Sequence, residues 1–462
     1  MISAYLRKFV TAAVILISFI PARFIAAQDT MYVSLQEFVQ LGIERSNQLK
    51  SSEAKWQQAI QKAEKIGKQR YLPTFSITTN HGLVPGVKSN SDLPKSEWHL
   101  DPNLENDWSN WSIFTQADLK AVQPLFTWGA LSSASKAANA GADAAEYQFQ
   151  MDEAELMYNL FQIYQSRLLA DNLKGLVVEA KETFRQAEKR IEKMYDQGDL
   201  ETKDFFQFRI SKEKFLIQIE EVEQNLKFIK RSWQLALDED TTVTVLPKGE
   251  DFSIIEPETF DATYFEQAAT MQRNEIKALD ASITAAKEGV WAEKAQMLPL
   301  VYFGFGGEYV STPRPAQNQP LLGDRYNYLN LVYSFGIRQN LNFWVQKEQI
   351  DMRQYQLREA QHGITAVRQG VILEVRNDYK NYMVNRTKAK QIEKAFVLSK
   401  EWLRTEQIDY DLGLGDVENV VDATKTSLEL EAEFNEAVYQ NNIKLGKLLH
   451  SSGILSSFIF NQ

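Results

Sequence analysis

The longest regular pattern of apolar and polar positions lies between Trp128 and Tyr195. This stretch contains no proline, and apolar residues recur within it at steps of three and four residues, the spacing of a helical seam. The residues of this seam are Leu169, Leu173, Leu176, Ala180, Phe184, Ala187, Ile191 and Met194. At ~1.5 Å per residue the helix would be roughly 100 Å long. Because no ordinary globular core is that wide, we expect it to pack along other long helices.

The gaps between prolines outline further helices, because proline is excluded from helix interiors. Prolines cluster between Pro73 and Pro124, at Pro247 and Pro257, and between Pro299 and Pro320. The helices predicted in this way span roughly residues 34–70, 128–195, 199–238, 259–297, 345–410 and 416–450.

Four segments between these helices alternate apolar with small or polar residues, which is the pattern of a strand with two different faces. They lie at residues 71–79, 116–122, 301–306 and 329–338. In a soluble sheet the apolar face would pack on a helix. In an outer-membrane barrel it would face lipid, and the polar face would line water. The joining segments 84–112 and 311–324 have the composition of solvated loops, which barrels of this kind carry on the outside of the cell.

The two halves of the chain share a series of landmarks, which indicates an internal repeat. The pairs are Leu72-Pro73 with Leu298-Pro299, Gln123-x-Leu125 with Gln339-x-Leu341, Trp128 with Trp344, and Tyr195-Asp196-x-Gly198 with Tyr410-Asp411-x-Gly413. We predict a first repeat over residues 28–258 and a second over residues 259–462, each built as helix, strand, loop, strand, long helix, turn and helix. Four strands cannot close a membrane barrel, which needs about eight, so any barrel must be shared between chains.

The N-terminal segment has the features of a secretory signal peptide over residues 1–27. Arg7 and Lys8 precede an apolar run, Phe9 to Ile20, that is too short to span a bilayer, and Ala26-Ala27 supplies small residues for cleavage. The alternative is an uncleaved membrane anchor. In either case we expect the protein to be exported.

Composition excludes several classes of function. The formal net charge of −10 argues against nucleic acid as a partner. The absence of cysteine excludes disulfides, thiolate metal sites and a cysteine nucleophile. The histidines, His81, His99, His362 and His450, show no metal-ligand spacing. We therefore expect no catalytic, cofactor-binding or metal site, and a protein that is not an enzyme.

With the repeat in view, the chain resembles the outer-membrane efflux protein family, the TolC type. The resemblance is carried by Leu72-Pro73, by Gln123-Pro124-Leu125-Phe126, by the two Tyr-x-x-Gly turns and by the run from Val421 to Leu428. It implies an α+β membrane protein and a homotrimer, in which three chains form a 12-stranded outer-membrane β-barrel continued by a periplasmic α-helical barrel. It also implies that residues 239–258 and the C-terminal tail lie near the equator of the helical barrel.

The function implied by the resemblance is that of an outer-membrane export duct in a tripartite efflux or type I secretion system. The duct would join a periplasmic adaptor and an inner-membrane transporter, and it would need no cofactor. Drug, metal, polysaccharide and protein cargoes all remain open.

The resemblance also assigns a periplasmic gate around the two Tyr-x-x-Gly turns. Asp204 and Tyr410 match a linked pair, Asp422 matches an aspartate that rings the aperture, and Asn419 stands where a second ring of aspartates is often found. Gly415 stands where a gate-linking arginine can occur. The alternative for Asp204 and Asp422 is an ordinary solvated helix position, and for Tyr410 a packing residue.

Tryptophans mark two further places. Trp128 and Trp344 occupy matching strand-to-helix junctions, where they are expected to anchor the membrane interface, although ordinary core packing is the alternative. Tryptophans in the first loop could cap the barrel mouth or pack within the loop; these are Trp98, Trp108 and Trp111.

A soluble periplasmic coiled-coil adaptor or scaffold is the rival function. It explains the helices and the signal peptide, but not four alternating strands at matching places in two halves. Extraction distinguishes the two, because a barrel needs detergent.

Overall fold

The structure is a computed structural model, and it describes residues 29–88, 105–198, 200–237, 243–248, 252–259, 261–312, 327–412, 414–415 and 417–461. The expected signal peptide at 1–27, Trp98 and most of the segment 311–324 lie outside the described residues. The chain forms two compact units. We call them the helical unit, residues 1–49, 153–272 and 373–462, and the sheet unit, residues 50–152 and 273–372. The repeat boundary at residue 258 stays a prediction.

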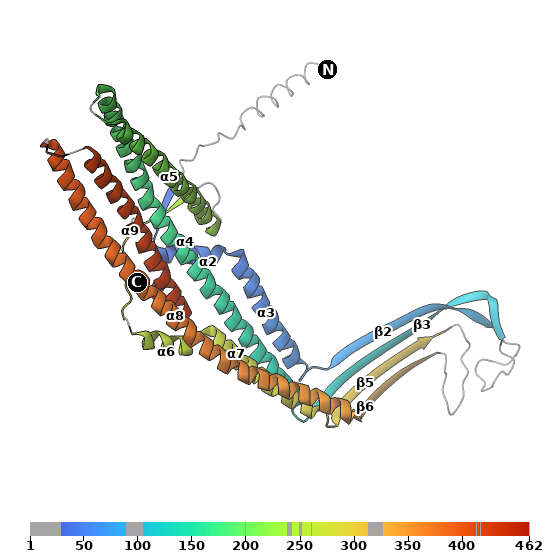
Figure 1. Ribbon diagram of the computed structural model, residues 1–462. Coiled ribbons are helices and arrows are strands. Elements are labelled where there is room, and N and C mark those ends of the chain that lie inside the picture. The colour runs from blue at the N-terminus through green and yellow to red at the C-terminus, as the bar shows by residue number, and fades with distance from the viewer. Residues whose placement is uncertain are drawn as a thin grey trace, which may run out of the picture. The chain divides into compact units, whose positions relative to one another are not determined.

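Long helices dominate the chain, as Figure 1 shows. The elements in chain order are β1 (Asp29–Val33), α2 (Leu35–Arg45), α3 (Asn47–Lys68), β2 (Thr74–Lys88), β3 (Glu105–Phe126), α4 (Ala130–Gln197), α5 (Thr202–Ala236), β4 (Val243–Pro247), α6 (Ala262–Gln272), α7 (Asn274–Ala295), β5 (Leu300–Ser311), β6 (Tyr328–Arg338), α8 (Phe343–Asp411), α9 (Val417–Ser451) and α10 (Leu455–Phe460). The bounds of α4, α5, α8 and α9 agree with the helices predicted from the proline gaps to within a few residues.

Two of the predicted helices are each broken once. The helix predicted over 34–70 is interrupted at Ser46, whose ψ of 110° is extended and whose Oγ accepts a hydrogen bond from the Leu49 N–H at 3.2 Å. The helix predicted over 259–297 is interrupted at Arg273, whose ψ is 122°. Neither break involves proline, so proline spacing could not find them. A serine that caps a new helix is the signal that marks the first break.

The core of the helical unit forms around a small sheet that sequence patterning did not predict. Strands β1 and β4 pair in parallel. Trp233 of α5 donates its indole N–H to the Val245 carbonyl at 2.9 Å, and the ring of Phe38 stacks on Trp233 with centroids 4.1 Å apart. The Tyr164 hydroxyl of α4 donates to the Val33 carbonyl at 3.3 Å. This cluster of buried aromatic side chains fixes α2, α4 and α5 to the two strands.

The sheet unit contains one antiparallel sheet of four strands in the order β2-β3-β5-β6 (Figure 1). The central ladder joins β3 of the first half to β5 of the second, with Thr115 opposite Ser311 and Phe126 opposite Val301. Both predicted strand pairs are confirmed, but the first pair is longer than expected. Residues 84–88 and 105–112, expected as loop, continue the β2–β3 ladder past a register shift between Pro85 and Gly86. The bulge admits the proline, so a loop-like composition does not end the pairing.

Candidate functional site: an amphipathic sheet and a helical hairpin tip

The four-stranded sheet has one apolar face. The register places Phe303 opposite Phe335 and Ile77 opposite Leu119, and side chains on one face follow at every second residue. The residues of this apolar face include Phe75, Ile77, Leu119, Phe303, Phe305, Leu331, Tyr333, Phe335 and Ile337. Phe335 is 75% exposed and Ile77 is 71% exposed. Because nothing in the described chain covers this face, it requires an apolar environment from outside the chain.

The opposite face of the sheet is mostly polar or small, although Val122, Tyr302 and Val332 also lie on it. Its residues include Thr74, Ser76, Thr78, Asn80, Gln116, Asp118, Lys120, Gly304, Gly306, Glu308, Asn330, Ser334, Gly336 and Arg338. The Gln116 amide donates to Asp118 at 3.3 Å and to Glu308 at 3.4 Å, so it bridges two carboxylates that lie opposite each other on β3 and β5. This is the composition of a face that lines water.

Both edges of this sheet are open. Within the described residues, β2 pairs only with β3, and β6 pairs only with β5. Unpaired backbone N–H and C=O groups are costly in a bilayer, where no water can satisfy them. The sheet is therefore an incomplete part of a larger one wherever it contacts lipid.

The two strand-to-helix junctions use the landmarks of the repeat in the same way. The Gln123 amide donates to the Arg70 carbonyl at 3.3 Å, and the Gln339 amide donates to the Met297 carbonyl at 3.1 Å. Each bond ties the end of a strand, or the residue just beyond it, to the backbone just after the preceding helix. The repeated glutamines therefore hold each strand end to the preceding helix. The sequence pattern identified these residues, but it did not predict this role.

Trp128 and Trp344 are both exposed at these junctions. Trp128 has a φ of 52°, Gly129 follows with a φ of 85°, and together they turn the chain from β3 into α4. The Trp128 indole donates to the Pro299 carbonyl at 2.8 Å and meets Phe126 edge to face at 4.9 Å. Trp344 is 69% exposed. Anchoring at a membrane interface stays a prediction for both. Trp108 and Trp111 lie in β3, in the part of the chain predicted as loop, and their rings pack against each other with centroids 6.0 Å apart.

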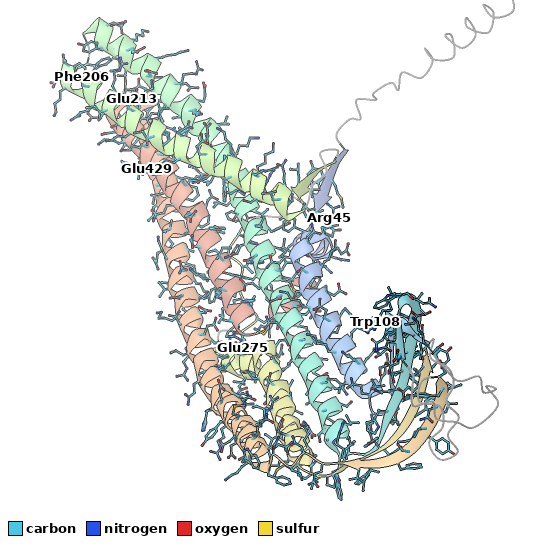
Figure 2. All side chains as sticks on the ribbon, turned by 90° about the vertical axis from the view of Figure 1, so that its right-hand side faces the viewer. Arg45, Trp108, Phe206, Glu213, Glu275 and Glu429 are labelled. Atoms are coloured by element: carbon cyan, nitrogen blue, oxygen red, sulfur yellow. The ribbon has the colours of Figure 1, made fainter. Side chains whose placement is uncertain are left out.

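The turn between α4 and α5 is held by aromatic packing. Gly198 has a φ of 79°, a conformation that favours glycine. The Tyr195 ring stacks on Phe205 at 4.3 Å, and Phe184 and Phe208 are buried together with Ile191. Phe206 lies at the outer end of α5 (Figure 2). Sequence reasoning missed this aromatic cluster, although the close spacing of phenylalanines at the start of α5 was a usable signal.

The turn between α8 and α9 leaves no room for a side chain at Gly415. The N–H groups of Leu414 and Gly415 both donate to the Asp409 carbonyl, at 2.9 and 3.0 Å. A Cβ on Gly415 would lie 2.9 Å from the Tyr410 nitrogen, closer than real contacts allow. The close approach of two backbone segments therefore accounts for glycine where the resemblance would permit arginine.

The four predicted gate residues lie on elements that flank these turns. Tyr410 is half-buried near the end of α8, and Asn419 and Asp422 are exposed in the first turns of α9. Asp204 is in α5, but its side chain lies outside the described residues. Asp422 lines a groove of about 470 Å³ together with Phe184 and Phe208. Among the described side chains, no hydrogen bond joins Tyr410 to Asn419 or Asp422, and the gate role stays a prediction.

No described helix carries an apolar stretch long enough to cross a bilayer. The described residues also contain no group of three or more histidine, aspartate or glutamate side chains placed to hold a metal ion.

The fold joins an amphipathic four-stranded sheet to long helices, and comparison with known proteins assigns this combination to a class. Residues 38–227 match the family described as outer membrane efflux protein. This match confirms the resemblance predicted from the sequence, and it agrees with an outer-membrane location and a transport rather than an enzymatic role. No curated protein sequence matches this chain.

Solved structures of outer-membrane channels share the fold. The channel CusC has 16% sequence identity, with 92% of this chain and 93% of that chain covered at a TM-score of 0.70. The CmeC outer membrane channel of Campylobacter jejuni has 15% identity over 91% of this chain and 86% of its own, at a TM-score of 0.69. The open state of the MtrE channel of Neisseria gonorrhoeae has 15% sequence identity, with 91% of this chain and 89% of that chain covered, at a TM-score of 0.64.

Proposed function

We propose that this protein is an outer-membrane export duct that serves a tripartite efflux or type I secretion system. The observation that carries the proposal is the four-stranded sheet, which has an exposed apolar face, a polar face and two open edges. A sheet of this kind satisfies its backbone in lipid only by closing into a barrel with other chains. Three chains of four strands make 12, an even number within the range of outer-membrane barrels.

Exposed apolar stripes on two helices of the helical unit support a homotrimer. Along α5, exposed apolar residues return to one side of the helix; they are Phe206, Ile210, Ile217, Phe228 and Leu235. Along α8, a second such stripe contains Leu373, Val384, Leu398 and Trp402. Lone exposed apolar residues are ordinary, but aligned ones mark an interaction surface. In the proposed trimer, α5 of one chain packs against α8 of the next.

A duct has no energy source of its own, so the proposal includes two partners. A periplasmic adaptor contacts the tips of the helical hairpins, and an inner-membrane transporter drives the cargo. The exposed side chains near the two turns, among them Phe206 and Asp422, would form the surface on which an adaptor acts to open the aperture.

Cross-linking of the open edges tests the shared barrel. The chain contains no cysteine, so Asn80→Cys in β2 and Ser334→Cys in β6 introduce the only thiols. Both positions belong to the polar face of an edge strand. Within one chain the edge strands are three strand spacings apart, about 14 Å, so a shorter bifunctional thiol reagent cannot join them.

The expected product in native membranes is a ladder of two and three chains, with none larger, and each single-cysteine variant is the matched control. A double-cysteine variant that gives only single chains, although both thiols react with a monofunctional reagent, would contradict the shared barrel. Extraction of the protein by buffer alone would favour the soluble scaffold instead.

A further inference from the structure

The β2–β3 hairpin extends beyond the other two strands of the sheet. Strand β5 ends at Ser311, opposite Thr115 of β3, and β6 pairs with β5 no further than this level. Strands β2 and β3 continue to pair as far as Lys88 and Glu105. Within the described residues, the hairpin therefore stands alone at this end of the sheet, where Figure 2 labels Trp108.

The extension carries an apolar patch on the same face as the apolar residues of the sheet. Trp111 and Ile113 follow at every second residue from Leu119, and Leu83 lies opposite Ile113. Trp108 comes after the register shift, but its ring meets that of Trp111 edge to face. We call Leu83, Trp108, Trp111 and Ile113 the outer aromatic patch. Each of these side chains is at least 51% exposed, so their mutual packing does not bury them.

Local hydrogen bonds hold the two tryptophans in place. The Trp111 indole N–H donates to the Trp108 carbonyl at 3.0 Å. The Asp107 carboxylate accepts from the Ser109 N–H at 3.1 Å and pairs with Lys88 of β2 at 3.5 Å. Two aromatic faces are thus fixed in position while they remain exposed. Preorganised aromatic side chains of this kind are typical of binding surfaces.

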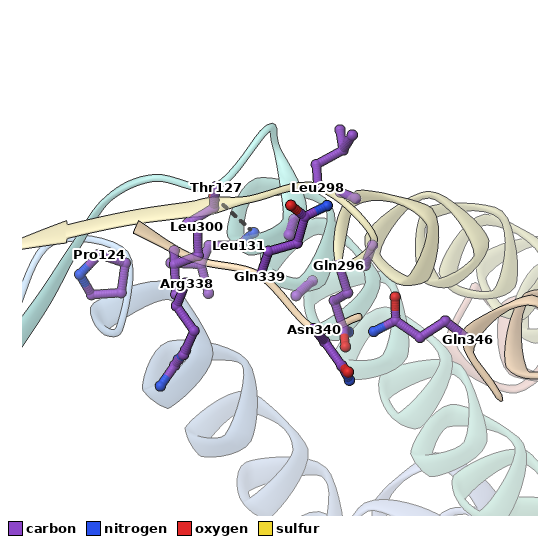
Figure 3. A pocket seen from close by; sticks show the side chains of 14 residues that line it. Pro124, Thr127, Leu131, Gln296, Leu298, Leu300, Arg338, Gln339, Asn340 and Gln346 are labelled. Carbon is purple, nitrogen blue, oxygen red and sulfur yellow. Dashed lines mark hydrogen bonds between the residues drawn. The ribbon is translucent and has the colours of Figure 1, made fainter. Parts of the chain in front are cut away.

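The strand register gives the extent of the apolar face below this patch. On β5 that face runs from Val301 to Tyr309, roughly 27 Å along the strand, or about 20 Å of height at a tilt near 40°. This is close to the ~25 Å apolar band of outer-membrane barrels. Its inner end lies at the junction drawn in Figure 3, where polar Gln339 and Asn340 follow β6. In the proposed duct, the outer edge of the hydrocarbon therefore lies near Tyr309.

The outer aromatic patch lies well beyond that edge. Ala117 is opposite Tyr309, and Trp111 is further along β3 by roughly 20 Å, which is about 15 Å of height. Between them, His81 Nδ1 and Thr115 Oγ1 lie 3.1 Å apart on the same face, so polar side chains interrupt the apolar surface. The patch is therefore too far out to be the aromatic girdle at the edge of the hydrocarbon.

At this height the outer leaflet of an outer membrane presents the sugars of its glycolipids. A sugar ring has an apolar C–H face, which can stack on an indole, and hydroxyl groups, which need hydrogen-bond partners. The patch offers both, because Ser109 and Asn110 are exposed beside the two tryptophans. We propose that the outer aromatic patch binds the core sugars of outer-leaflet lipopolysaccharide. The inference rests on the proposed function.

Thermal unfolding of the trimer in lipid nanodiscs tests this inference. The nanodiscs contain phospholipid alone, phospholipid with lipid A, which lacks the core sugars, or phospholipid with rough lipopolysaccharide that carries a complete core. A ligand that binds only the folded state raises the unfolding temperature. We expect lipopolysaccharide to raise the wild-type midpoint by about 2–4 °C more than lipid A does. Trp108→Ser combined with Trp111→Ser should remove most of this difference.

Two further variants separate sugar binding from general stability. Trp108→Tyr combined with Trp111→Tyr keeps two aromatic faces and should retain most of the difference. Trp344→Ser is the matched control, because it removes a tryptophan that is 69% exposed at the opposite end of the sheet. It should leave the difference unchanged. Each variant is compared with itself in lipid A, so a change in its intrinsic stability does not affect the result.

The outcomes separate the inference from the proposed function. A double serine variant whose midpoint falls by the same amount in all three lipids overturns the sugar site and leaves the duct standing. A wild type with equal midpoints in lipid A and lipopolysaccharide also overturns the site. An equal loss of the difference in Trp344→Ser refutes it as well, because the effect would not belong to the patch. A wild-type protein that does not enter nanodiscs as a trimer overturns the proposed function and the site together.

Discussion

At the scale of single residues, the glutamine that recurs in both halves of the chain makes the same kind of hydrogen bond in each half. Gln123 and Gln339 make equivalent hydrogen bonds to the backbone beyond the preceding helix. We expect Gln123→Leu and Gln339→Leu each to lower the free energy of unfolding by about 0.5–1.5 kcal/mol, the net value of one such bond. The double variant should lose about the sum, because the two bonds share no partner. Thermal unfolding followed by circular dichroism checks this; no change in either single variant would mean that water replaces the ties at no cost.

The gate residues carry a prediction about conductance. Tyr410 and Asp204 come from different halves of the chain, and a hydrogen bond between them would hold the two hairpins together at a net value of about 1–3 kcal/mol. Tyr410→Phe combined with Asp204→Ala should therefore raise single-channel conductance. Asp422→Ala should weaken block by trivalent cations from the periplasmic side, because it removes a ring of three carboxylates from the trimer. Unchanged conductance in an intact trimer would show that these residues only pack the tip.

Asp378 of α8 carries a prediction about pH. It is 8% exposed, its Oδ2 atom has no hydrogen-bond partner among the described residues, and burial raises the pKa of its carboxyl. The folded state therefore binds this proton more tightly than the unfolded state, and stability falls as pH rises from the unfolded pKa through the folded pKa. Asp378→Asn should be more stable than the wild type at neutral pH, and the difference should vanish when the pH falls below the unfolded pKa of about 4. Melting temperatures of both proteins, measured above and below that pH, test this prediction. A variant less stable than the wild type at neutral pH would show that the carboxylate stabilises the fold.

At the scale of elements, long proline-free segments predict the long helices, whereas short strands and helix breaks have no clear sequence pattern. Helices α4 and α8 were evident because a proline-free segment of nearly seventy residues is typical of a long helix. Strands β1 and β4 were missed because each has five residues, too few to show alternation. The breaks at Ser46 and Arg273 depend on local capping and backbone geometry, which proline spacing does not report.

Some features of the candidate site follow from the sequence pattern, and others arise only from three-dimensional packing. Alternation predicted the two faces of the sheet, because side-chain direction follows directly from residue number in a strand. The outer aromatic patch around Trp108 and Trp111 could not be predicted, since it depends on strand pairing that continues past the register shift between Pro85 and Gly86. Gly415 departs from the family pattern in the sequence, but the cause of this departure, the close approach of the Asp409 and Tyr410 backbone, is visible only in three dimensions.

The alternation of β6 supports a direct test of which face meets lipid. Phe335 belongs to the apolar face and Ser334 to the polar face. Phe335→Arg should destabilise the protein in a bilayer by about 2–4 kcal/mol if the position lies near the midplane, because the charge would enter hydrocarbon. Ser334→Arg, its matched control, should have a much smaller effect. Denaturant titrations in lipid vesicles measure both, and equal losses would mean that the assignment of faces is wrong.

At the scale of the whole molecule, the proposed duct depends on a sheet that is shared between chains. In the proposed duct, further copies of the chain would complete its open edges and the exposed stripes of α5 and α8, and lipid would cover its apolar face. The match of residues 38–227 to the outer membrane efflux protein family agrees with an outer-membrane location for this sheet.

The mass of the complex released from membranes tests this claim most directly. Native mass spectrometry of the detergent-extracted protein should show one dominant species with three copies of the chain. That species should come from the outer-membrane fraction and be absent from the buffer-soluble fraction. A monodisperse single chain that is released by buffer without detergent would contradict the shared barrel.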